Sequence, residues 1–463
     1  MSILIPHDTA QAIGPQAGLC ESRALFASRF ADPTSKEDAR KTWFNHLIAK
    51  KAAATFSRQA DAPSWHPPGA VLLHARLQSR LMVNMAGGVM ENAGLSLDRY
   101  GLPHIPGSAV KGCARRAALA ALREWCETET KPAGAENLFT PLCAGSASPA
   151  DLLKFLCLVF GWVEQDWSTE KNTNGTWKSD FAWACHGIGE TWKATAETLC
   201  GHFHAGIKTG VAPWESLPNS AGSIAFLHAS PNRDPGLVLD VLTPHHKDYY
   251  EGKLQTATDT EDPVPVFFPA VREQGEKDYF TFPLIPLRSA DSTLLEFAKL
   301  ALRTGLETFG LGAKTNAGYG WFDASEALNE FVHAEKLETA NRQAKEAEAD
   351  EKRKLLEEET KIKAEARASK DSILAGLSPE AQEDKKLEWL TDAQFDAKVR
   401  AFCKEPRRGG PTEVEKKAIV RALREPRLAY WQTFKTKATK GDPATVDQAI
   451  RALSKTLNLG KMP

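Results

Sequence analysis

The sequence predicts an α+β protein in which one domain of strands and helices, residues 70–325, precedes a long charged helix and a small all-α domain. Residues 70–325 alternate strand-like and helix-like apolar patterns in the order strand, helix, several strands, helix, strand, which matches a β-α-β-β-α-β unit. Residues 326–370 are dominated by charge, with ten acidic and ten basic side chains between Glu335 and Lys370. Residues 371–463 contain helix-start signals and spaced large apolar side chains, which a small helical domain requires.

Each element of the first domain has its own signal. Short apolar stretches bounded by turn residues predict strands at 70–83, 223–229, 236–242, 264–268 and 278–286. A helix is expected from Ser108, a natural N-cap after a Pro-Gly turn, to about Trp125, and a second one at 292–309. The last strand ends at Phe322, and this order is that of a ferredoxin-like unit. Residues 1–69 are expected to form an N-terminal arm with local helix.

Charge is distributed unevenly along the chain. The total is -1, but sixteen Lys or Arg against six Asp or Glu between Lys398 and Met462 give a net of +10, which leaves -11 for residues 1–397. A basic C-terminal domain fits RNA or an acidic protein surface, and it fits a helical bundle with a solvated basic face equally well. Its partner therefore stays open.

The composition favours a cytoplasmic protein without a cofactor. Eight cysteines lie in mostly apolar surroundings without a CxxC pair, so free thiols are expected. No apolar stretch approaches the roughly 18 residues of a membrane helix, and the N-terminus lacks the pattern of a signal peptide. We therefore expect no membrane partner.

Six of the twelve tryptophans fall between Trp162 and Trp214. This Trp-rich segment, at about 161–218, is expected to be an insertion with its own small core, and stacking of its aromatic rings on RNA bases is the alternative. Histidines near Cys185 and Cys200 lack the spacing of a zinc site, so no metal is expected.

The first of two glycine-bearing turns opens the first predicted helix. It reads Pro106-Gly107-Ser108, and Lys111 and Arg115 follow one helical turn apart on one face. A helix N-terminus offers free N–H groups to an anion, although a capped surface helix with solvated cations explains the pattern as well.

The second turn, Gly310–Gly320, opens the last predicted strand. Four glycines in eleven residues leave little to bury, and Lys314, Thr315 and Asn316 suit a phosphate-lined ligand; a tight turn is the simpler reading. In the predicted topology both turns lie at one side of the sheet. Lys111, Arg115 and Arg116 are therefore expected to face the same ligand as Lys314.

These residues resemble the RAMP superfamily of CRISPR-associated proteins. Residues 105–115 are similar to its IPGSS-x-KG-x-x-R motif, with Ala109 where a second Ser is usual, and Gly310–Gly320 is similar to its C-terminal glycine-rich loop. Together with Leu239–His246 and Pro263–Phe268, the loop most resembles the family of sixth subunits of the type III-B Cmr complex. The resemblance covers about residues 70–323, so it implies nothing about the tail.

The resemblance implies a single RRM-like RAMP domain that caps the backbone filament at the 3′ end of the CRISPR RNA. The implied partners are CRISPR RNA, possibly target RNA, and neighbouring Cmr subunits, and the implied role is non-catalytic. RNA would be held mainly through phosphates and 2′-hydroxyls. The residues expected to contact it are Gly107, Ser108, Lys111, Arg115, Arg116, His245, His246, Gly310, Gly312, Lys314, Thr315, Asn316, Gly318, Tyr319 and Gly320.

Two other functions compete with RNA-binding. The first is a metal-independent RAMP-type endoribonuclease that processes CRISPR RNA, with His245 or His246 as general base beside Asp248 and Tyr249. The second, a nucleotide-binding protein, is weak because the chain has no GxxxxGK[ST] pattern.

Overall fold

The computed structural model separates the chain into two compact units, Met1–Leu337 and Glu338–Pro463. It describes residues 5–13, 22–34, 37–50, 69–87, 90, 94–128, 147–203, 210–243, 245–258, 265–287, 291–403, 410–437 and 442–463. Within these residues six cysteines are free thiols, while Cys20 and Cys143 lie outside them.

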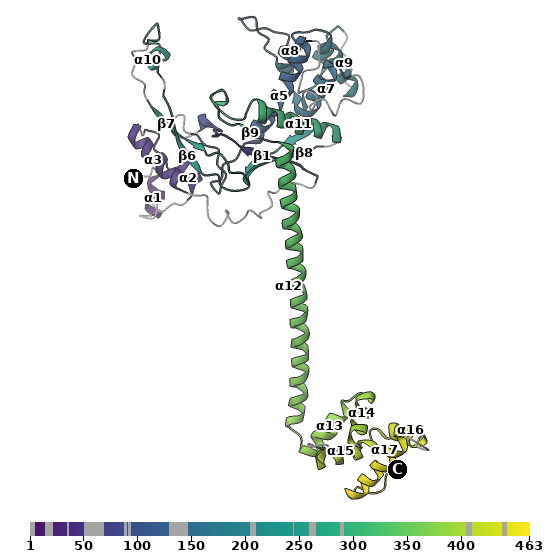
Figure 1. Cartoon of the computed structure of the whole chain (residues 1–463). Helices are drawn as coiled ribbons and strands as arrows, with labels where there is room; N and C mark the ends of the chain where they lie inside the picture. The colour runs from purple at the N-terminus through teal and green to yellow at the C-terminus, as the bar shows by residue number, and fades with distance from the viewer. Residues whose placement is uncertain are drawn as a thin grey trace. The chain divides into compact units, whose positions relative to one another are not determined.

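The first unit is built on a five-stranded antiparallel sheet (Figure 1). The strand order is β4-β8-β1-β9, and the short β5 also pairs with β8. The first strand of the chain therefore lies between two strands from the far end of the unit. The strands are β1 Val71–Leu77, β4 Ile224–Phe226, β5 Ser230–Pro231, β8 Phe280–Pro286 and β9 Phe322–Asp323.

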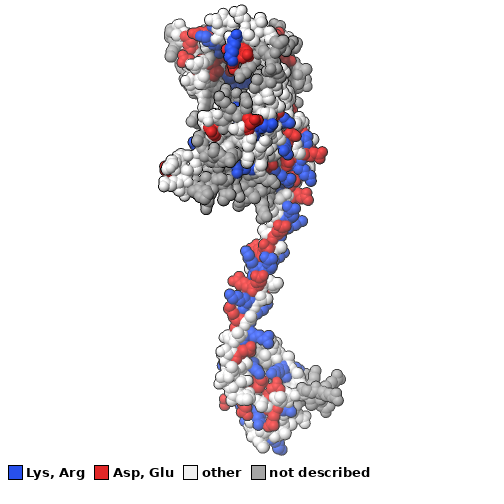
Figure 2. All heavy atoms as spheres, turned by 90° about the vertical axis from the view of Figure 1, so that its left-hand side faces the viewer, with Lys and Arg blue, Asp and Glu red and all other residues white. Residues whose placement is uncertain are grey.

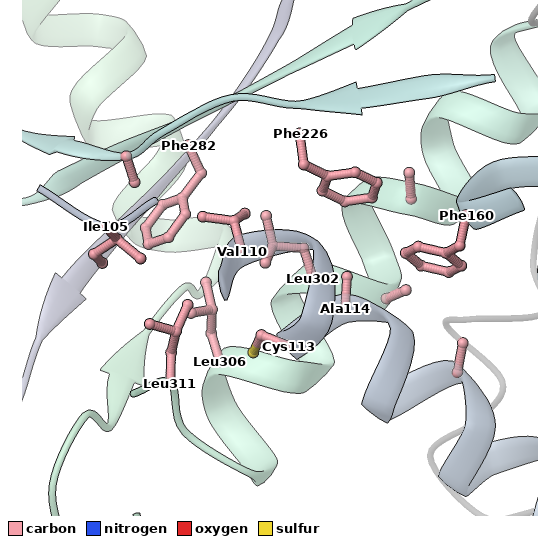
Figure 3. Packing of buried hydrophobic residues seen from close by; sticks show 14 of the residues in the cluster. Ile105, Val110, Cys113, Ala114, Phe160, Phe226, Phe282, Leu302, Leu306 and Leu311 are labelled. Carbon is pink, nitrogen blue, oxygen red and sulfur yellow. The ribbon is translucent and has the colours of Figure 1, made fainter. Parts of the chain in front are cut away.

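Two helices, α5 (Gly107–Thr128) and α11 (Ser292–Thr308), cover one face of this sheet (Figures 1 and 3). Figure 3 shows side chains of both helices and of the strands meeting in one buried layer. The helices cross closely at Gly305, where a Cβ would lie 2.7 Å from the carbonyl oxygen of Cys113. A side chain at this position would force the helices apart.

The first turns of α12 (Glu326–Ala375) pack against the opposite side of the sheet beside His74 and Tyr279. Side chains alternate along a strand, so His74 of β1 points away from α5 and α11; it is only 6% exposed. Tyr279, Leu328 and Val332 form a small buried cluster on this side. The start of α12 thus buries the part of this face that lies around His74 and Tyr279.

The N-terminal helices pack onto the domain. Phe26 and Trp43 stack with ring centroids 4.1 Å apart and belong to the main core. Arg23, whose side chain is 1% exposed, donates to both carboxylate oxygens of Asp234 at 2.9 Å. Helices α2 Arg23–Ser28 and α3 Glu37–Ala49 of the expected N-terminal arm are therefore part of a packed structure, and α1 His7–Ile13 precedes them.

A two-stranded hairpin extends from the sheet and carries the short helix α10 (Lys247–Tyr250) at its far end (Figure 1). Its strands are β6 (Leu237–Leu242) and β7 (Val266–Val271), paired antiparallel along their whole length. Helix α3 supports it, with Lys41 Nζ 4.5 Å from the ring centroid of Phe267. We refer to residues 237–271 as the β6–β7 hairpin.

The Trp-rich segment packs beside α5. Trp167 and Trp192 meet edge to face at 4.8 Å, and both are buried in the same contiguous core as the sheet. The expected separate core is therefore wrong, because α7 and α8 pack directly against α5. The elements are α7 Pro149–Phe160, β2 Gly161–Trp162, η5 Glu164–Trp167, α8 Asp180–Ala184, α9 Glu190–His202, η6 Pro213–Ser216 and β3 Ser220–Ala221.

The second unit contains the greater part of α12 and a helical bundle. Figure 2 shows both signs of charge interspersed along α12, as expected for a solvated helix. In the bundle Phe395, Ile419 and Trp431 are buried, and Ser378 and Thr412 are N-caps. The bundle helices are α13 Pro379–Glu388, α14 Asp392–Phe402, α15 Glu413–Arg424, α16 Leu428–Lys437 and α17 Asp442–Thr456.

Candidate nucleic-acid interface

The glycine-rich loop closes on itself through a main-chain hydrogen bond from Leu311 N to Gly320 O, at 2.8 Å. Gly310, Gly312, Gly318 and Gly320 all have positive φ, between 69° and 101°. A Cβ at Gly320 would overlap the Leu311 carbonyl, whereas the Cβ position of Gly318 is open. The loop therefore needs glycine for backbone shape and close approach, and the short helix η7 (Thr315–Ala317) forms its tip.

The loop is attached to the segment that follows β1. Gly320 N donates to Arg80 O and Ala313 N donates to Met82 O, both at 2.8 Å. A Cβ at Gly312 would overlap the Met82 carbonyl. The first strand was expected to reach residue 83, but it ends at Leu77 because the following main chain pairs with the loop.

Further main-chain hydrogen bonds continue from this segment to the start of α5. Ser96 N donates to Val83 O at 3.2 Å, and His104 N donates to Ser96 O at 3.0 Å. Ile105 and Ala229 then exchange two hydrogen bonds of 2.9 Å. We call the set of segments 80–83, 96–105 and 311–320 the loop ladder. It joins the two glycine-bearing turns into one ordered surface.

The start of α5 is fixed by close packing against β4. A Cβ at Gly107 would overlap the carbonyl oxygen of Phe226, so this position requires glycine. The helix begins at Gly107, and Pro106 O accepts from the amides of Ala109 and Val110. Ser108, expected as the N-cap, therefore lies inside the first turn, where it is exposed.

A second connection runs from α5 directly to the glycine-rich loop. Cys113 Sγ donates to Gly310 O at 3.6 Å, and the Arg116 guanidinium lies 4.8 Å from the ring centroid of Phe309. Burial raises the pKa of the Cys113 thiol to about 12, so it stays protonated as a donor. The structure thus brings Arg116, itself exposed, next to the beginning of the loop.

Lys314 adopts the left-handed conformation with φ 63°, which is unfavourable for a side chain other than Gly or Asn. Its Nζ lies 5.0 Å from the ring centroid of Phe268 in the β6–β7 hairpin. The loop and the hairpin also share a small buried cluster formed by Met82, Phe268 and Ala270. Backbone strain at a lysine is typical of functional positions.

Asp240 joins the β6–β7 hairpin to Arg80 and to Tyr319 of the glycine-rich loop. We refer to these three residues as the Asp240 corner. Arg80 Nη1 contacts its carboxylate at 2.5 Å, and the Tyr319 hydroxyl donates to the same carboxylate. Burial and the hydrogen bond to Asp240 raise the pKa of Tyr319 to about 12. Burial opposes ionisation of Asp240, but hydrogen bonds from Arg80 and Tyr319 outweigh it and lower the pKa of this carboxyl. Tyr319, expected to contact RNA, is thus bound within the protein.

Arg115 faces the Trp-rich segment. Its guanidinium pairs with Asp166 at 2.8 Å and with Asp180, and it lies 5.5 Å from the ring centroid of Phe181. Burial and the Arg115 charge lower the pKa of Lys111, against the attraction of Asp166. Two carboxylates of the Trp-rich segment therefore engage Arg115, and that it faces the same ligand as Lys314 stays a prediction.

His245 and His246 directly precede α10 at the far end of the β6–β7 hairpin (Figure 1). Their ring centroids are 6.5 Å apart, and Lys253 Nζ contacts Asp248 at 3.1 Å. The structure places this pair on the hairpin, apart from the start of α5. That His245 and His246 contact RNA stays a prediction.

Two histidines at the loop ladder escaped the sequence analysis. His104 precedes Ile105, and His228 precedes the Ala229 that bonds to Ile105; their rings lie 6.1 Å apart at 88°. Position directly before the Pro-Gly turn was the available signal for His104, whereas nothing in the sequence links it to His228.

Among the described residues no group of three or more His, Cys, Asp or Glu side chains is arranged to hold a metal ion. His204, considered with the histidines of the Trp-rich segment, lies outside them. None of the described helices combines the length and the apolar character needed to cross a membrane.

Comparison with known proteins places the sequence features in one context. A family model described as the RAMP superfamily matches residues 63–323. The CRISPR system Cmr subunit Cmr6 of Pyrococcus furiosus is 32% identical over 107 residues, which cover 21% of this chain and 30% of that protein. The match thus spans less than a third of the relative's length.

Two solved structures are similar at low identity. The crystal structure of Cmr6 from Pyrococcus furiosus aligns at 20% identity with a TM-score of 0.27, over 55% of this chain and 98% of the other. A chain of the type III-B Cmr-β complex bound to cognate target RNA aligns at 15% identity with a TM-score of 0.29, over 70% and 78%.

Proposed function

Because the chain belongs to the RAMP superfamily, whose model matches more than half of its residues, we propose that it is a non-catalytic, RNA-binding structural subunit of a type III-B CRISPR effector complex. The observation that carries this proposal is the loop ladder, which holds the two glycine-bearing turns in one rigid surface at the end of the sheet. The similarity to Cmr6 over 107 residues supports the choice of complex.

We assign the first unit to the ferredoxin-like, RRM-like arrangement. The order β4-β8-β1-β9, with α5 after β1 and α11 after β8, supports this assignment, because a β-α-β-β-α-β chain with antiparallel neighbours places its first and third strands at the centre. The Trp-rich elements and the β6–β7 hairpin are additions to this frame.

RNA is held through its backbone in this proposal. An RRM commonly stacks bases on the open face of its sheet, but here the first turns of α12 occupy part of that face, beside His74 and Tyr279. The loop ladder instead offers main-chain groups, the Lys314 ammonium and the Arg116 guanidinium. Such groups recognise phosphates and 2′-hydroxyls without reading sequence, which suits a subunit that accepts any guide.

Within the complex the chain caps the backbone near the 3′ end of the CRISPR RNA and contacts neighbouring Cmr subunits. Exposed apolar side chains on the β6–β7 hairpin support a contact with a neighbour: Tyr250 is 77% exposed, and Leu242 and Val241 nearly half. The subunit acts in the cytoplasm, where CRISPR RNA and invader RNA meet.

RNA binding is tested with the charge reversals K314E and R116E, and with K193E, an exposed lysine of α9, as matched control. Affinity for a single-stranded RNA is measured by anisotropy across a salt series. The logarithm of the binding constant falls linearly with the logarithm of the salt concentration, and each lost phosphate contact should make this slope shallower by about 0.7. Unchanged affinity and slope in both variants would remove the proposal.

The endoribonuclease alternative makes a different prediction. Repeat RNA incubated with the protein in the presence of a chelator should stay intact, because we assign His245 and His246 no chemical step. Cleavage by the wild-type chain that disappears in H245A or H246A would overturn the non-catalytic assignment. Co-purification with a CRISPR RNA and other Cmr subunits tests membership in the complex.

A further inference from the structure

His104 and His228 form a polar pair at the edge of the loop ladder. Their ring centroids are 6.1 Å apart with the planes perpendicular, and each residue lies next to the double hydrogen bond between Ile105 and Ala229. This hydrogen-bonded bridge fixes the spacing of the two imidazoles. His104 is half-buried and His228 is exposed, so a ligand can reach both rings from the same side of the bridge.

Both imidazoles retain hydrogen-bonding capacity. The nearest polar partner of His104 is the Ser96 hydroxyl, at 3.5 Å from Nδ1 and 3.3 Å from Nε2. One oxygen at these distances from both nitrogens is not well aligned with either. The carboxylate of Asp98 has partners of its own, since its Oδ1 accepts from the amides of Tyr100 and Leu102 at 2.8 and 2.9 Å.

We propose that His104 and His228 bind one phosphodiester of the RNA, and that this binding is coupled to protonation of His104. This inference rests on the proposed RNA-binding function and adds two contact residues and a pH dependence to it. Two cationic imidazoles without a bonded carboxylate repel one another, and a phosphate placed between them removes that repulsion and accepts a hydrogen bond from each.

The groups around His104 support this coupling. Burial, and then the charge of His228, lower the pKa of His104, while the charge of Asp98 opposes them. In the free protein His104 is therefore largely neutral at pH 7. A bound phosphate favours the charged form and raises this pKa, so RNA must bind more tightly as the pH falls.

The two histidines differ in their acid–base chemistry from Lys314 and Arg116, the cations of the proposed RNA-binding surface. Lysine and arginine keep their charge across the neutral range, so Lys314 and Arg116 give an affinity that depends on salt and hardly on pH. The histidine pair adds a component that changes between about pH 5 and pH 8. The two contributions can therefore be separated in one titration.

The test measures the affinity of the full chain for a fluorescent single-stranded RNA between pH 5.5 and 8 at constant ionic strength. The wild type should gain about tenfold in affinity towards low pH, the effect of one charge-assisted hydrogen bond. H104Q and H228Q should lose most of this gain, whereas H7Q, which removes an exposed histidine of α1, should keep it.

H228R separates charge from folding. An arginine at this exposed position keeps a permanent cation, so affinity at pH 8 should rise above that of the wild type while the pH dependence becomes flatter. Isothermal titration at pH 6.5 in buffers of different ionisation enthalpy should show proton uptake on RNA binding by the wild type and none by the H104Q/H228Q double variant.

The outcomes separate the two proposals. RNA binding with the same pH dependence in the wild type, H104Q and H228Q would overturn the inference and leave the proposed function standing. A wild-type chain that binds no RNA at any pH would overturn the proposed function and the inference together. Circular dichroism melts of each variant show whether a lost affinity reflects lost folding.

Discussion

The side-chain amide of Asn329 hydrogen-bonds both main-chain groups of His74. Asn329 Nδ2 donates to the His74 carbonyl oxygen at 2.9 Å, and the His74 amide donates to Asn329 Oδ1 at 2.8 Å. Because β9 pairs only with Arg76 and Leu77, it does not reach these groups of β1. One side chain of α12 therefore takes the place of a strand at this edge of the sheet.

Replacement of Asn329 by Ala should destabilise the first unit. Two partly buried main-chain groups of β1 lose their partners, and each such loss costs about 1 kcal/mol or more, so a total of about 2 kcal/mol is expected in chemical denaturation. N341A changes an exposed asparagine of the same helix and should stay within about 0.5 kcal/mol of the wild type. Equal stability of N329A and N341A would contradict the strand-like role.

Replacement of glycine by alanine should have opposite effects on stability at Gly320 and at Gly112. G320A places a Cβ against the Leu311 carbonyl at φ 69° and should destabilise the loop by about 2 kcal/mol or more. G112A lies in α5 with open space around its Cβ and should stabilise the unit by about 0.5–1 kcal/mol. Thermal melts of the two variants should therefore shift in opposite directions.

Lys314→Gly should separate folding from binding. Glycine removes the cost of a left-handed lysine, roughly 1 kcal/mol, and this offsets the entropy that glycine adds to the unfolded chain. The melting temperature should be unchanged or higher, while RNA affinity falls because the cation is gone. A variant that loses stability, or that binds RNA like the wild type, would contradict the role assigned to Lys314.

The Asp240 corner should make stability depend on pH in a defined direction. The pKa of this carboxyl is lowered in the folded chain, so its contribution is present above the unfolded value, near 3.9, and is lost as the pH falls through the folded value. D240N should therefore be less stable than the wild type at pH 7, by about 1–2 kcal/mol.

This difference in unfolding free energy should shrink below about pH 4, because the Asp240 carboxyl of the unfolded chain takes up a proton there, while that of the folded chain stays charged until the pH reaches its lowered pKa. Glu276→Gln, at an exposed carboxylate, should leave stability unchanged at both pH values. A D240N deficit that is the same at pH 3.5 and pH 7 would show that packing, and not the charge of Asp240, holds the corner.

The order of elements was predictable from the sequence because it depends on local signals. Alternating apolar residues indicate β1 and β8, and apolar residues at helical spacing indicate α11. Ser378 and Thr412 are residue types that commonly begin helices, and each is an N-cap in the structure. The end of β1 was missed since Gln78 to Val83 look like strand in isolation. Their partner is a loop more than 200 residues away.

The candidate site was predictable only as two separate motifs. Gly107, Gly312 and Gly320 lie where another segment of the backbone comes close. A glycine pattern in the sequence indicates such contacts, but it does not identify the segment on the other side. The direction of Arg115 depends on Asp166 and Asp180, and the corner at Tyr319 depends on Asp240. No local pattern encodes these pairings.

The inner position of β1 has a consequence for synthesis on the ribosome. This strand leaves the exit tunnel first, but its two partners are β8 and β9, which end at Pro286 and Asp323. Both edges of β1 therefore stay open while more than 200 further residues are translated, and unpaired strand edges in a nascent chain invite aggregation. Truncations that stop before residue 323 should accumulate as insoluble protein, so the β9 strand sets the minimum length of an expressible first unit.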